Sequence, residues 1–198
     1  MTSRTVRVVL WIAAFAAAFA SVLAVILIVA GRTPTPMMAT ASAVGGPFSL
    51  VDQNGQTITD GDLRGHPYLV FFGFTHCPDV CPTTLFEVSE VLRHLGPDGD
   101  RARALFVTVD PERDTPEKLK DYLSSFDPRL SGLTGSREAI ERMLKAYRVY
   151  AKKVATEAGY TMDHTALVYL MDKQGRFVAP FNLKRRPEEA AADLRRHL

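Results

Sequence analysis

The protein has 198 residues, of which 46% are hydrophobic, 23% charged and 9% aromatic, and its formal net charge is +2. This composition is typical of a globular protein and excludes a disordered or low-complexity chain. When Arg4 and Arg7 are set aside, 22 basic residues remain against 22 acidic ones. The rest of the chain therefore lacks the basic excess of a nucleic-acid-binding protein, and no nucleic-acid partner is expected.

The N-terminal region contains an uncharged apolar stretch at residues 8–30. About 20 such residues are enough to cross a bilayer as a helix, so we expect a transmembrane anchor here, preceded by a cytoplasmic tail at 1–7. Arg4 and Arg7 favour a cytoplasmic N-terminus, although Arg32 on the far side weakens this bias. A cleaved signal peptide is the alternative, but its apolar region usually has only about 7–15 residues.

The charge of the tail also indicates the compartment. The tail has two arginines and no long amphipathic run, so it is unlike a mitochondrial targeting sequence. We therefore expect the protein in the bacterial inner membrane, with its C-terminal part in the periplasm. Residues 31–46 are rich in Pro, Thr, Ser, Ala and Gly, as linkers are. Residues 47–198 are enough for one domain with its own core.

The first elements of this domain are predicted from turn signals and apolar runs. Residues 47–65 indicate a β-hairpin that turns at Asn54-Gly55. The continuous apolar run "PYLVFFGFT" predicts a central strand that is covered on both faces. After Cys81, apolar residues recur at helical spacing and the helix should end at Gly96-Pro97. These apolar residues are Leu85, Val88, Leu92 and Leu95.

The second half of the domain continues the alternation. "RALFVTVD" predicts another buried strand, Thr115-Pro116 starts a helix, and Ser136 caps a further one. "VYAKKVA" alternates weakly, which favours a short strand, and "TALVYLMD" predicts a second central strand followed by a hairpin and a last helix. The resulting order of strand, helix, strand, helix, helix, hairpin and helix predicts an α/β sandwich with helices on both faces.

Cys77 and Cys81 are the only cysteines, and each precedes a proline. Because a residue before proline avoids the α region, Cys81 suits the N-cap of the helix, with Pro82 as its first helical residue. Both thiols are expected where a buried strand meets a helix, which is where ligands bind in open α/β sheets. We also expect the helix N-terminus to lower the thiol pKa values.

Two thiols placed in this way can close a disulfide or chelate a metal, and we interpret them as a redox-gated metal site that binds only when reduced. Thiolates select Cu(I) or zinc, but structural zinc prefers four ligands and the chain has no second cysteine pair. Two cysteines with one histidine suit copper, as Cu(I) or Cu(II). His164, before a central strand, is the candidate third ligand, with a surface histidine as the alternative; His76 should point away from Cys77.

Three sequence blocks resemble the signatures of the Sco/SenC proteins: "GFTHCPDVCPTTL", "FVTVDPERDTPEKLKDYL" and "DHTALVYLMDKQGRF". These are membrane-anchored, thioredoxin-like copper proteins that help to assemble the dinuclear copper centre of cytochrome c oxidase. The resemblance implies a thioredoxin-like three-layer sandwich for 47–198 and copper ligation by Cys77, Cys81 and His164.

The resemblance also bears on polar residues near these ligands. It implies that Asp79 tunes the cysteine loop or meets a partner, whereas the residues alone favour a polar turn. Asp163, beside His164, is a candidate for the same roles. The "DPERDTPE" block is accounted for mainly by a strand end and a helix cap, and the resemblance implies only that its surface joins in docking.

Two functional hypotheses follow. The first is a copper metallochaperone that delivers copper to cytochrome c oxidase subunit II, with a periplasmic copper donor and a thiol reductant as further partners. The second is a thiol–disulfide oxidoreductase that keeps the subunit II cysteines reduced, which would be the only enzymatic activity expected. The four-residue cysteine spacing, and Asp163-His164-Thr165 where thioredoxins carry a cis-proline, argue against a general thioredoxin. A peroxiredoxin-type peroxidase is disfavoured because its cysteine motif differs.

Overall fold

The computed structural model describes four ranges of the chain: residues 11–13, 15–24, 44–157 and 159–198. The first two ranges are helical. No helix among the described residues combines the length and the apolar character needed to cross a membrane. The tail at 1–7, part of the expected anchor at 8–30 and most of the linker at 31–46 lie outside the described residues, so these assignments stay predictions. The chain divides into two units, and the one at 43–198 contains both cysteines.

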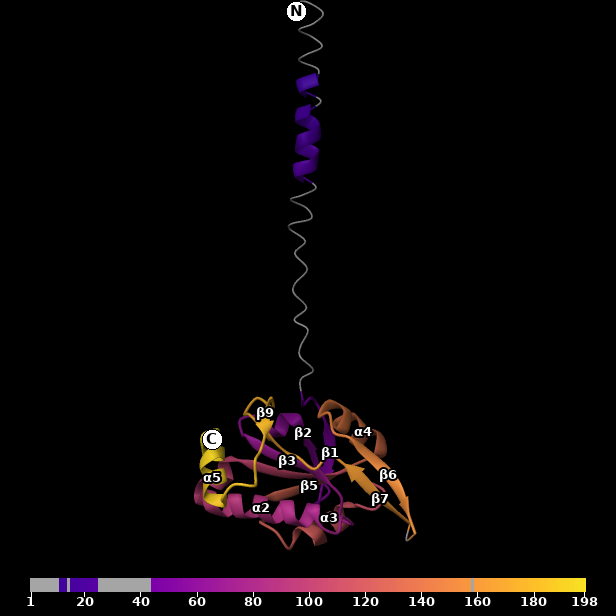
Figure 1. Ribbon diagram of the computed structural model, residues 1–198, viewed down its shortest axis with the longest axis vertical. Helices are drawn as coiled ribbons and strands as arrows, with labels where there is room; N and C mark the ends of the chain where they lie inside the picture. Colours follow the sequence, from indigo (N-terminus) through magenta and orange to yellow (C-terminus); the bar gives the residue numbers. More distant parts are fainter. Residues whose placement is uncertain (1–10, 14, 25–43, 158) are drawn as a thin grey trace, which may run out of the picture. The chain divides into compact units, whose positions relative to one another are not determined.

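A seven-stranded sheet forms the centre of this unit, in the order β2-β1-β5-β4-β3-β8-β9 (Figure 1). Strands β3, β4 and β5 run parallel, whereas β1 and β8 are antiparallel to their neighbours β5 and β3. The strands are β1 (Ser49–Asp52), β2 (Thr57–Thr59), β3 (Tyr68–Gly73), β4 (Arg103–Thr108), β5 (Leu130–Thr134), β8 (Val168–Met171) and β9 (Phe177–Pro180). Two further strands, β6 (Ala151–Thr156) and β7 (Gly159–His164), pair with each other in a separate antiparallel sheet.

Helices cover both faces of the seven-stranded sheet. They are α2 (Val80–Leu95), α3 (Pro116–Leu123), α4 (Arg137–Ala146) and α5 (Pro187–Arg195), with short 3-10 helices at η1 (Asp60–Leu63) and η2 (Gly96–Arg101). Figure 1 shows α2 and α3 along one side of the sheet and α4 on the other. The α/β sandwich expected from the sequence is thereby confirmed.

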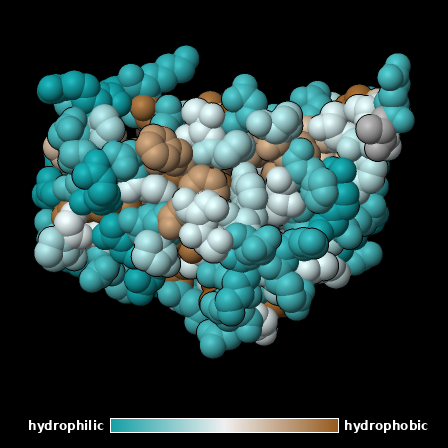
Figure 2. Space-filling view, turned by 90° about the horizontal axis from the view of Figure 1, so that it is seen from below, coloured by the Kyte–Doolittle hydropathy of each residue, from teal (hydrophilic) through white to brown (hydrophobic). Residues whose placement is uncertain are grey.

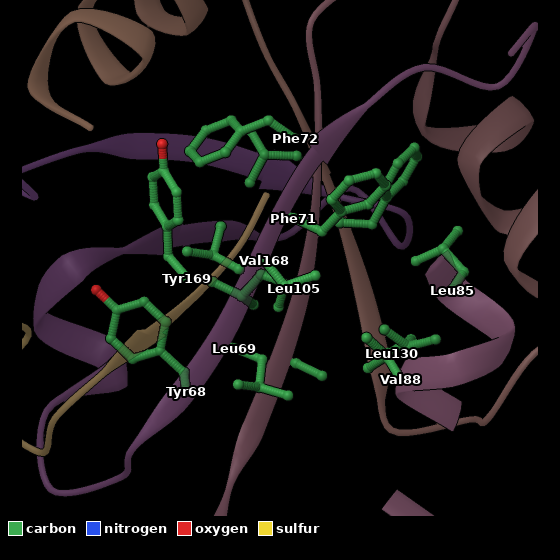
Figure 3. Close-up of a cluster of buried hydrophobic side chains, with 14 of the residues drawn as sticks. Tyr68, Leu69, Phe71, Phe72, Leu85, Val88, Leu105, Leu130, Val168 and Tyr169 are labelled. Carbon is green, nitrogen blue, oxygen red and sulfur yellow. The ribbon is translucent and has the colours of Figure 1, made fainter. Parts of the chain in front are cut away.

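Strand β3 lies at the core of the domain, and all six of its residues are buried. Its side chains alternate between the two faces. Figure 3 shows Phe71 on the side of α2, and Tyr68 and Phe72 on the opposite side. On that opposite side, Phe72 packs on Tyr147 with ring centroids 5.5 Å apart, and the hydroxyls of Tyr68 and Tyr147 are 2.9 Å apart. Burial on both faces explains why this strand reads as a continuous apolar run.

Local sequence signals correctly placed the turns at Gly55 and Gly96 and the N-caps of α3 and α4. The β1–β2 hairpin turns through Gly55 at φ 81°, and α2 ends before Gly96 at φ 59°; both are left-handed conformations that glycine adopts readily. The hydroxyl of Thr115 accepts a hydrogen bond from the backbone N–H of Lys118, and that of Ser136 caps α4 in the same way. These predictions are confirmed.

Two strands were not predicted from the sequence. Strand β5 lies between the two helices predicted to start at Thr115-Pro116 and at Ser136, and its central Gly132 weakens the strand signal. A Cβ atom at this position would lie 2.7 Å from the Leu123 side chain, so the glycine allows α3 to pack directly on β5. No strand was predicted for residues 159–164, before the "TALVYLMD" strand, but these residues form β7, which pairs with β6 and ends at His164.

Candidate metal centre

The cysteine loop, residues 74–79, connects β3 to α2, as expected. The N-cap of α2 differs from the prediction. The N-cap of α2 is Asp79 rather than Cys81, so Pro82 is the third helical residue. Proline is tolerated there because the first N–H groups of a helix have no partner within the helix. The Asp79 side chain makes no capping bond; instead the N–H of Cys81 points at Cys77 Sγ, 3.4 Å away. The Cys77 sulfur therefore occupies the capping position.

The Cys81 sulfur packs into the space beside Gly73, the last residue of β3. A Cβ atom on Gly73 would lie 2.8 Å from Cys81 Sγ and 2.7 Å from the ring of Phe106. Cys81 is completely buried, and Cys77 nearly so. The absence of a side chain at position 73 is thus what makes room for one of the two thiols.

Burial controls the protonation of this thiol. Desolvation raises the pKa of Cys81 far above its ordinary value, with a smaller contribution from its hydrogen bond to Cys77. For Cys81 the expectation that the helix N-terminus would lower the pKa is wrong, because burial of the thiol raises the pKa instead. In the metal-free protein the Cys81 thiol is therefore neutral at physiological pH, and a metal must displace its proton on binding.

His164, the last residue of β7, brings its ring to the same place. Its Nε2 lies 3.7 Å from Cys81 Sγ, and its Nδ1 lies 3.1 Å from the backbone oxygen of Thr165. A carbonyl oxygen can only accept a hydrogen bond, so the Nδ1 atom carries the proton and the Nε2 lone pair faces the sulfur. Metal-binding histidines typically use this arrangement, in which one nitrogen donates to a carbonyl and the other binds the metal.

Aromatic rings hold the imidazole in this orientation. The ring of Phe74 stands edge-on to it with centroids 5.7 Å apart and an interplanar angle of 88°, and Phe71 makes a second edge contact at 6.3 Å. Such contacts restrict rotation of the ring about its side-chain bonds. The imidazole is therefore preorganised beside the sulfur.

The ligand atoms of Cys77, Cys81 and His164 all lie within 4.8 Å of one another, and both cysteines are free thiols. Two atoms bound to one metal at about 2.0–2.3 Å lie at most about 4.6 Å apart. Only small side-chain shifts are needed to close the three donors on one ion. The structure thus brings together the three residues that the sequence singled out, across 83 positions between Cys81 and His164.

The other candidates lie outside this cluster. Asp163 is exposed, and the alternation of strand β7 turns it to the opposite face from His164. Asp79 is exposed and lines a surface hollow of about 510 Å³, together with residues that include Val80 and Leu167. Their roles in docking or in tuning the loop stay predictions. The side chain of His76 is 52% exposed, and this ring is separate from the three-residue cluster.

One buried residue was missed by the sequence reasoning, which assigned the "DPERDTPE" block to capping. Asp114 is fully buried and accepts hydrogen bonds from the backbone N–H and the hydroxyl of Thr75, at 3.0 and 2.7 Å. Thr75 is two residues before Cys77, so this carboxylate supports the cysteine loop. An acidic residue shortly after a buried strand was the available signal, because such positions adjoin the ligand-binding edge of a sheet.

Comparison with known proteins identifies the family. The family model described as SCO1/SenC matches residues 36–198. The chain belongs to the SCO1/SenC family. The resemblance seen in the three sequence blocks is thereby confirmed, and the domain has the α/β thioredoxin-like fold of Sco proteins.

Curated relatives include bacterial and mitochondrial proteins. The chain is 41% identical over 143 residues to the SCO2-like protein RP587 of Rickettsia prowazekii, covering 71% of this chain and 70% of that protein. It is 40% identical over 162 residues to the mitochondrial protein SCO1 homolog of Homo sapiens, covering 78% of this chain. The match spans only 53% of the human protein, about half of its length.

Solved structures of Sco proteins share the fold. The chain is 66% identical to Bradyrhizobium japonicum ScoI, solved with copper bound, with a TM-score of 0.78 over 79% of this chain and 100% of that one. Yeast Sco1 with copper bound is 36% identical, with a TM-score of 0.71 over 78% of this chain and 88% of that one. Both similarities cover more than three quarters of this chain.

Proposed function

We propose that the protein is a copper metallochaperone that holds copper through the Cys77 and Cys81 sulfurs and His164 Nε2. The observation that carries this proposal is the convergence of three donor atoms within 4.8 Å, with the unprotonated ring nitrogen facing a sulfur. Copper-bound structures of two Sco relatives support the choice of metal. Two soft thiolates with one imidazole are also a donor set that suits copper.

The acceptor we propose is subunit II of cytochrome c oxidase, and the proposed location is the bacterial inner membrane, with 47–198 in the periplasm. Three ligands leave a position open for an incoming ligand of the acceptor. Because Cys81 is completely buried whereas His164 is partly exposed, the acceptor approaches from the side of His164. Transfer then proceeds by ligand exchange, and the deeply buried Cys81 sulfur releases copper last.

The surface next to the site offers a place for such a partner. Val80 is 42% exposed and Leu167 is 47% exposed, and both line the hollow described above. On α2, Phe86 is also exposed. Figure 2, which views the side of α2 and α3, shows a group of apolar residues near the middle of a largely hydrophilic face. Exposed apolar side chains beside a metal site are suited to a short-lived protein–protein contact.

A thiol–disulfide oxidoreductase is the second candidate, and it is favoured by the two free thiols at the start of a helix in a thioredoxin-like fold. In this reaction the thiols of Cys77 and Cys81 exchange with a disulfide of subunit II. The pair becomes a disulfide, and the acceptor receives two thiols with their protons. A disulfide removes both sulfur ligands, so the same reaction would also switch copper binding off.

Replacing His164 with alanine is expected to weaken Cu(I) binding by about 100-fold, because one of three donors is lost and this neutral imidazole contributes roughly 3 kcal/mol. The reduced protein and the variant would be titrated with Cu(I) against a competing chelator. The matched control is His76→Ala, which removes a histidine next to Cys77 but outside the cluster. Tight one-to-one binding by the native protein is expected, and equal affinities of the native and His164→Ala proteins would remove His164 from the site.

Transfer to subunit II separates the two candidate functions. Copper-loaded protein would be mixed with a soluble fragment of subunit II, and the appearance of copper in the fragment would be followed by absorption. A metallochaperone is expected to load the fragment, and His164→Ala to load it poorly. If instead the metal-free protein reduces the fragment's disulfide equally well with and without the His164→Ala change, the oxidoreductase hypothesis is favoured.

A further inference from the structure

A short segment between β4 and α3 contacts both halves of the proposed copper site. We call residues Asp110–Asp114 the bridging loop. Toward the cysteine loop, the buried Asp114 carboxylate accepts the two bonds from Thr75 described above and a third, at 2.6 Å, from the hydroxyl of Thr108 in β4. The cysteine loop is therefore anchored to the main sheet through this carboxylate.

The bridging loop also holds the β6–β7 hairpin, which carries His164. The hydroxyl of Tyr160 in β7 donates to Asp110 Oδ1 at 3.0 Å, and Arg113 Nη1 donates to the backbone oxygen of Tyr160 at 3.1 Å. The guanidinium of Arg113 also lies over the Tyr160 ring, 3.8 Å from its centroid. On the neighbouring strand, Lys153 Nζ donates to Glu112 at 2.6 Å.

These contacts matter because β6 and β7 pair only with each other among the described strands. An isolated two-stranded hairpin is marginally stable in water and has no hydrogen-bonded neighbour to fix its position. Backbone pairing with the main sheet therefore does not set the position of His164. Side-chain contacts with the bridging loop are available to do so.

A third set of contacts reaches the imidazole through one aromatic ring. The guanidinium of Arg113 lies 5.8 Å from the centroid of Phe74, and Phe74 makes the edge contact with His164. Arg113 is itself paired with the carboxylate of Asp110, which is buried. The same arginine thus supports both the strand that carries His164 and the ring that orients it.

We propose that the bridging loop is a positioning element that sets the distance between His164 and the cysteine pair. This inference rests on the proposed copper function, because the distance matters only if the three residues share a ligand. None of the contacts described above joins the bridging loop directly to Cys77, Cys81 or His164. The loop instead contacts Thr75, Tyr160 and Phe74, which lie next to these ligands in the chain or in space. Outer contacts of this kind typically change metal affinity by about 10–100-fold.

Tyr160→Phe is the most selective variant, since it removes the hydrogen bond to Asp110 and keeps the aromatic ring. We expect it to weaken Cu(I) binding by about 10-fold. The matched control is Tyr150→Phe, at an exposed tyrosine just before β6 whose hydroxyl makes no hydrogen bond within the described residues; its affinity should equal that of the native protein. All proteins would be titrated at full length in detergent with the same competing chelator.

A double-mutant cycle then distinguishes positioning from a general structural role. If Tyr160 acts through His164, adding Tyr160→Phe to His164→Ala should cause no further loss of affinity. A purely structural role would weaken binding by the same factor in both backgrounds, and that result would overturn the inference. Equal affinities of the native and Tyr160→Phe proteins would overturn it as well.

A measurement on the metal-free protein keeps this inference separable from the copper proposal. In Tyr160→Phe, backbone amides of β7 should exchange with solvent at least several-fold faster than in the native protein, while those of β3 should not change. If the native protein binds no copper, the proposed function fails, and faster exchange in β7 would still show that the hydrogen bond from Tyr160 to Asp110 holds the β6–β7 hairpin in place. Unchanged exchange in β7 would overturn the inference.

Discussion

Replacing Cys81 with serine is expected to lower the affinity for Cu(I) by more than about 1000-fold, a larger loss than that caused by removing His164. A serine hydroxyl stays protonated near neutral pH and is a hard donor, so it cannot replace a thiolate on a soft ion. The two side chains are close in size, so the buried position should be filled and the fold kept. Chelator competition on the reduced, folded variant measures the loss.

Thr84→Ser is a suitable control for this change. Thr84 is also buried and lies three residues further along α2, but it is not among the three clustered ligand candidates. Its replacement alters packing in the same helix without removing a donor, so native affinity is expected. Binding by Cys81→Ser within about tenfold of the native protein would mean that copper is held elsewhere, and the proposed site would be wrong.

Replacing Gly73 with alanine is expected to affect both stability and copper binding. The added methyl group would lie 2.7 Å from the Phe106 ring, 2.8 Å from Cys81 Sγ and 3.2 Å from the Phe71 ring. All three neighbours are buried, so the core must shift, at a cost of about 1–3 kcal/mol in the free energy of unfolding. Because one of the displaced atoms is a proposed ligand, copper affinity should fall as well.

Chemical denaturation of the reduced, metal-free variant gives the change in stability, and a Cu(I) titration under native conditions gives the change in affinity. Gly61→Ala is the matched control, since its added methyl group would meet only the Thr59 hydroxyl, at 3.4 Å. It should leave both quantities close to their native values. If Gly73→Ala also left both unchanged, the Cys81 sulfur would not be held in place by the close contact at Gly73.

Much of the fold could be predicted from local patterns. The apolar run of β3, the helical spacing in α2 and the caps at Thr115 and Ser136 each depend on neighbouring residues, so the sequence was sufficient for them. Strand β5 was missed because Gly132, which allows α3 to pack closely, also weakens the strand pattern. Strand β7 was missed because it lies outside the main sheet and has no fully buried residue.

The sequence by itself determined the ligand types and the placement of both thiols where β3 leads into α2, because the apolar run of the strand and the helical spacing after Cys81 are local patterns. Only the tertiary structure decided that His164 Nε2 lies 3.7 Å from the Cys81 sulfur. It also decided that burial raises the pKa of Cys81, and that the bridging loop touches both the cysteine loop and the hairpin. These features depend on desolvation and on contacts between segments far apart in the chain, which no local pattern encodes.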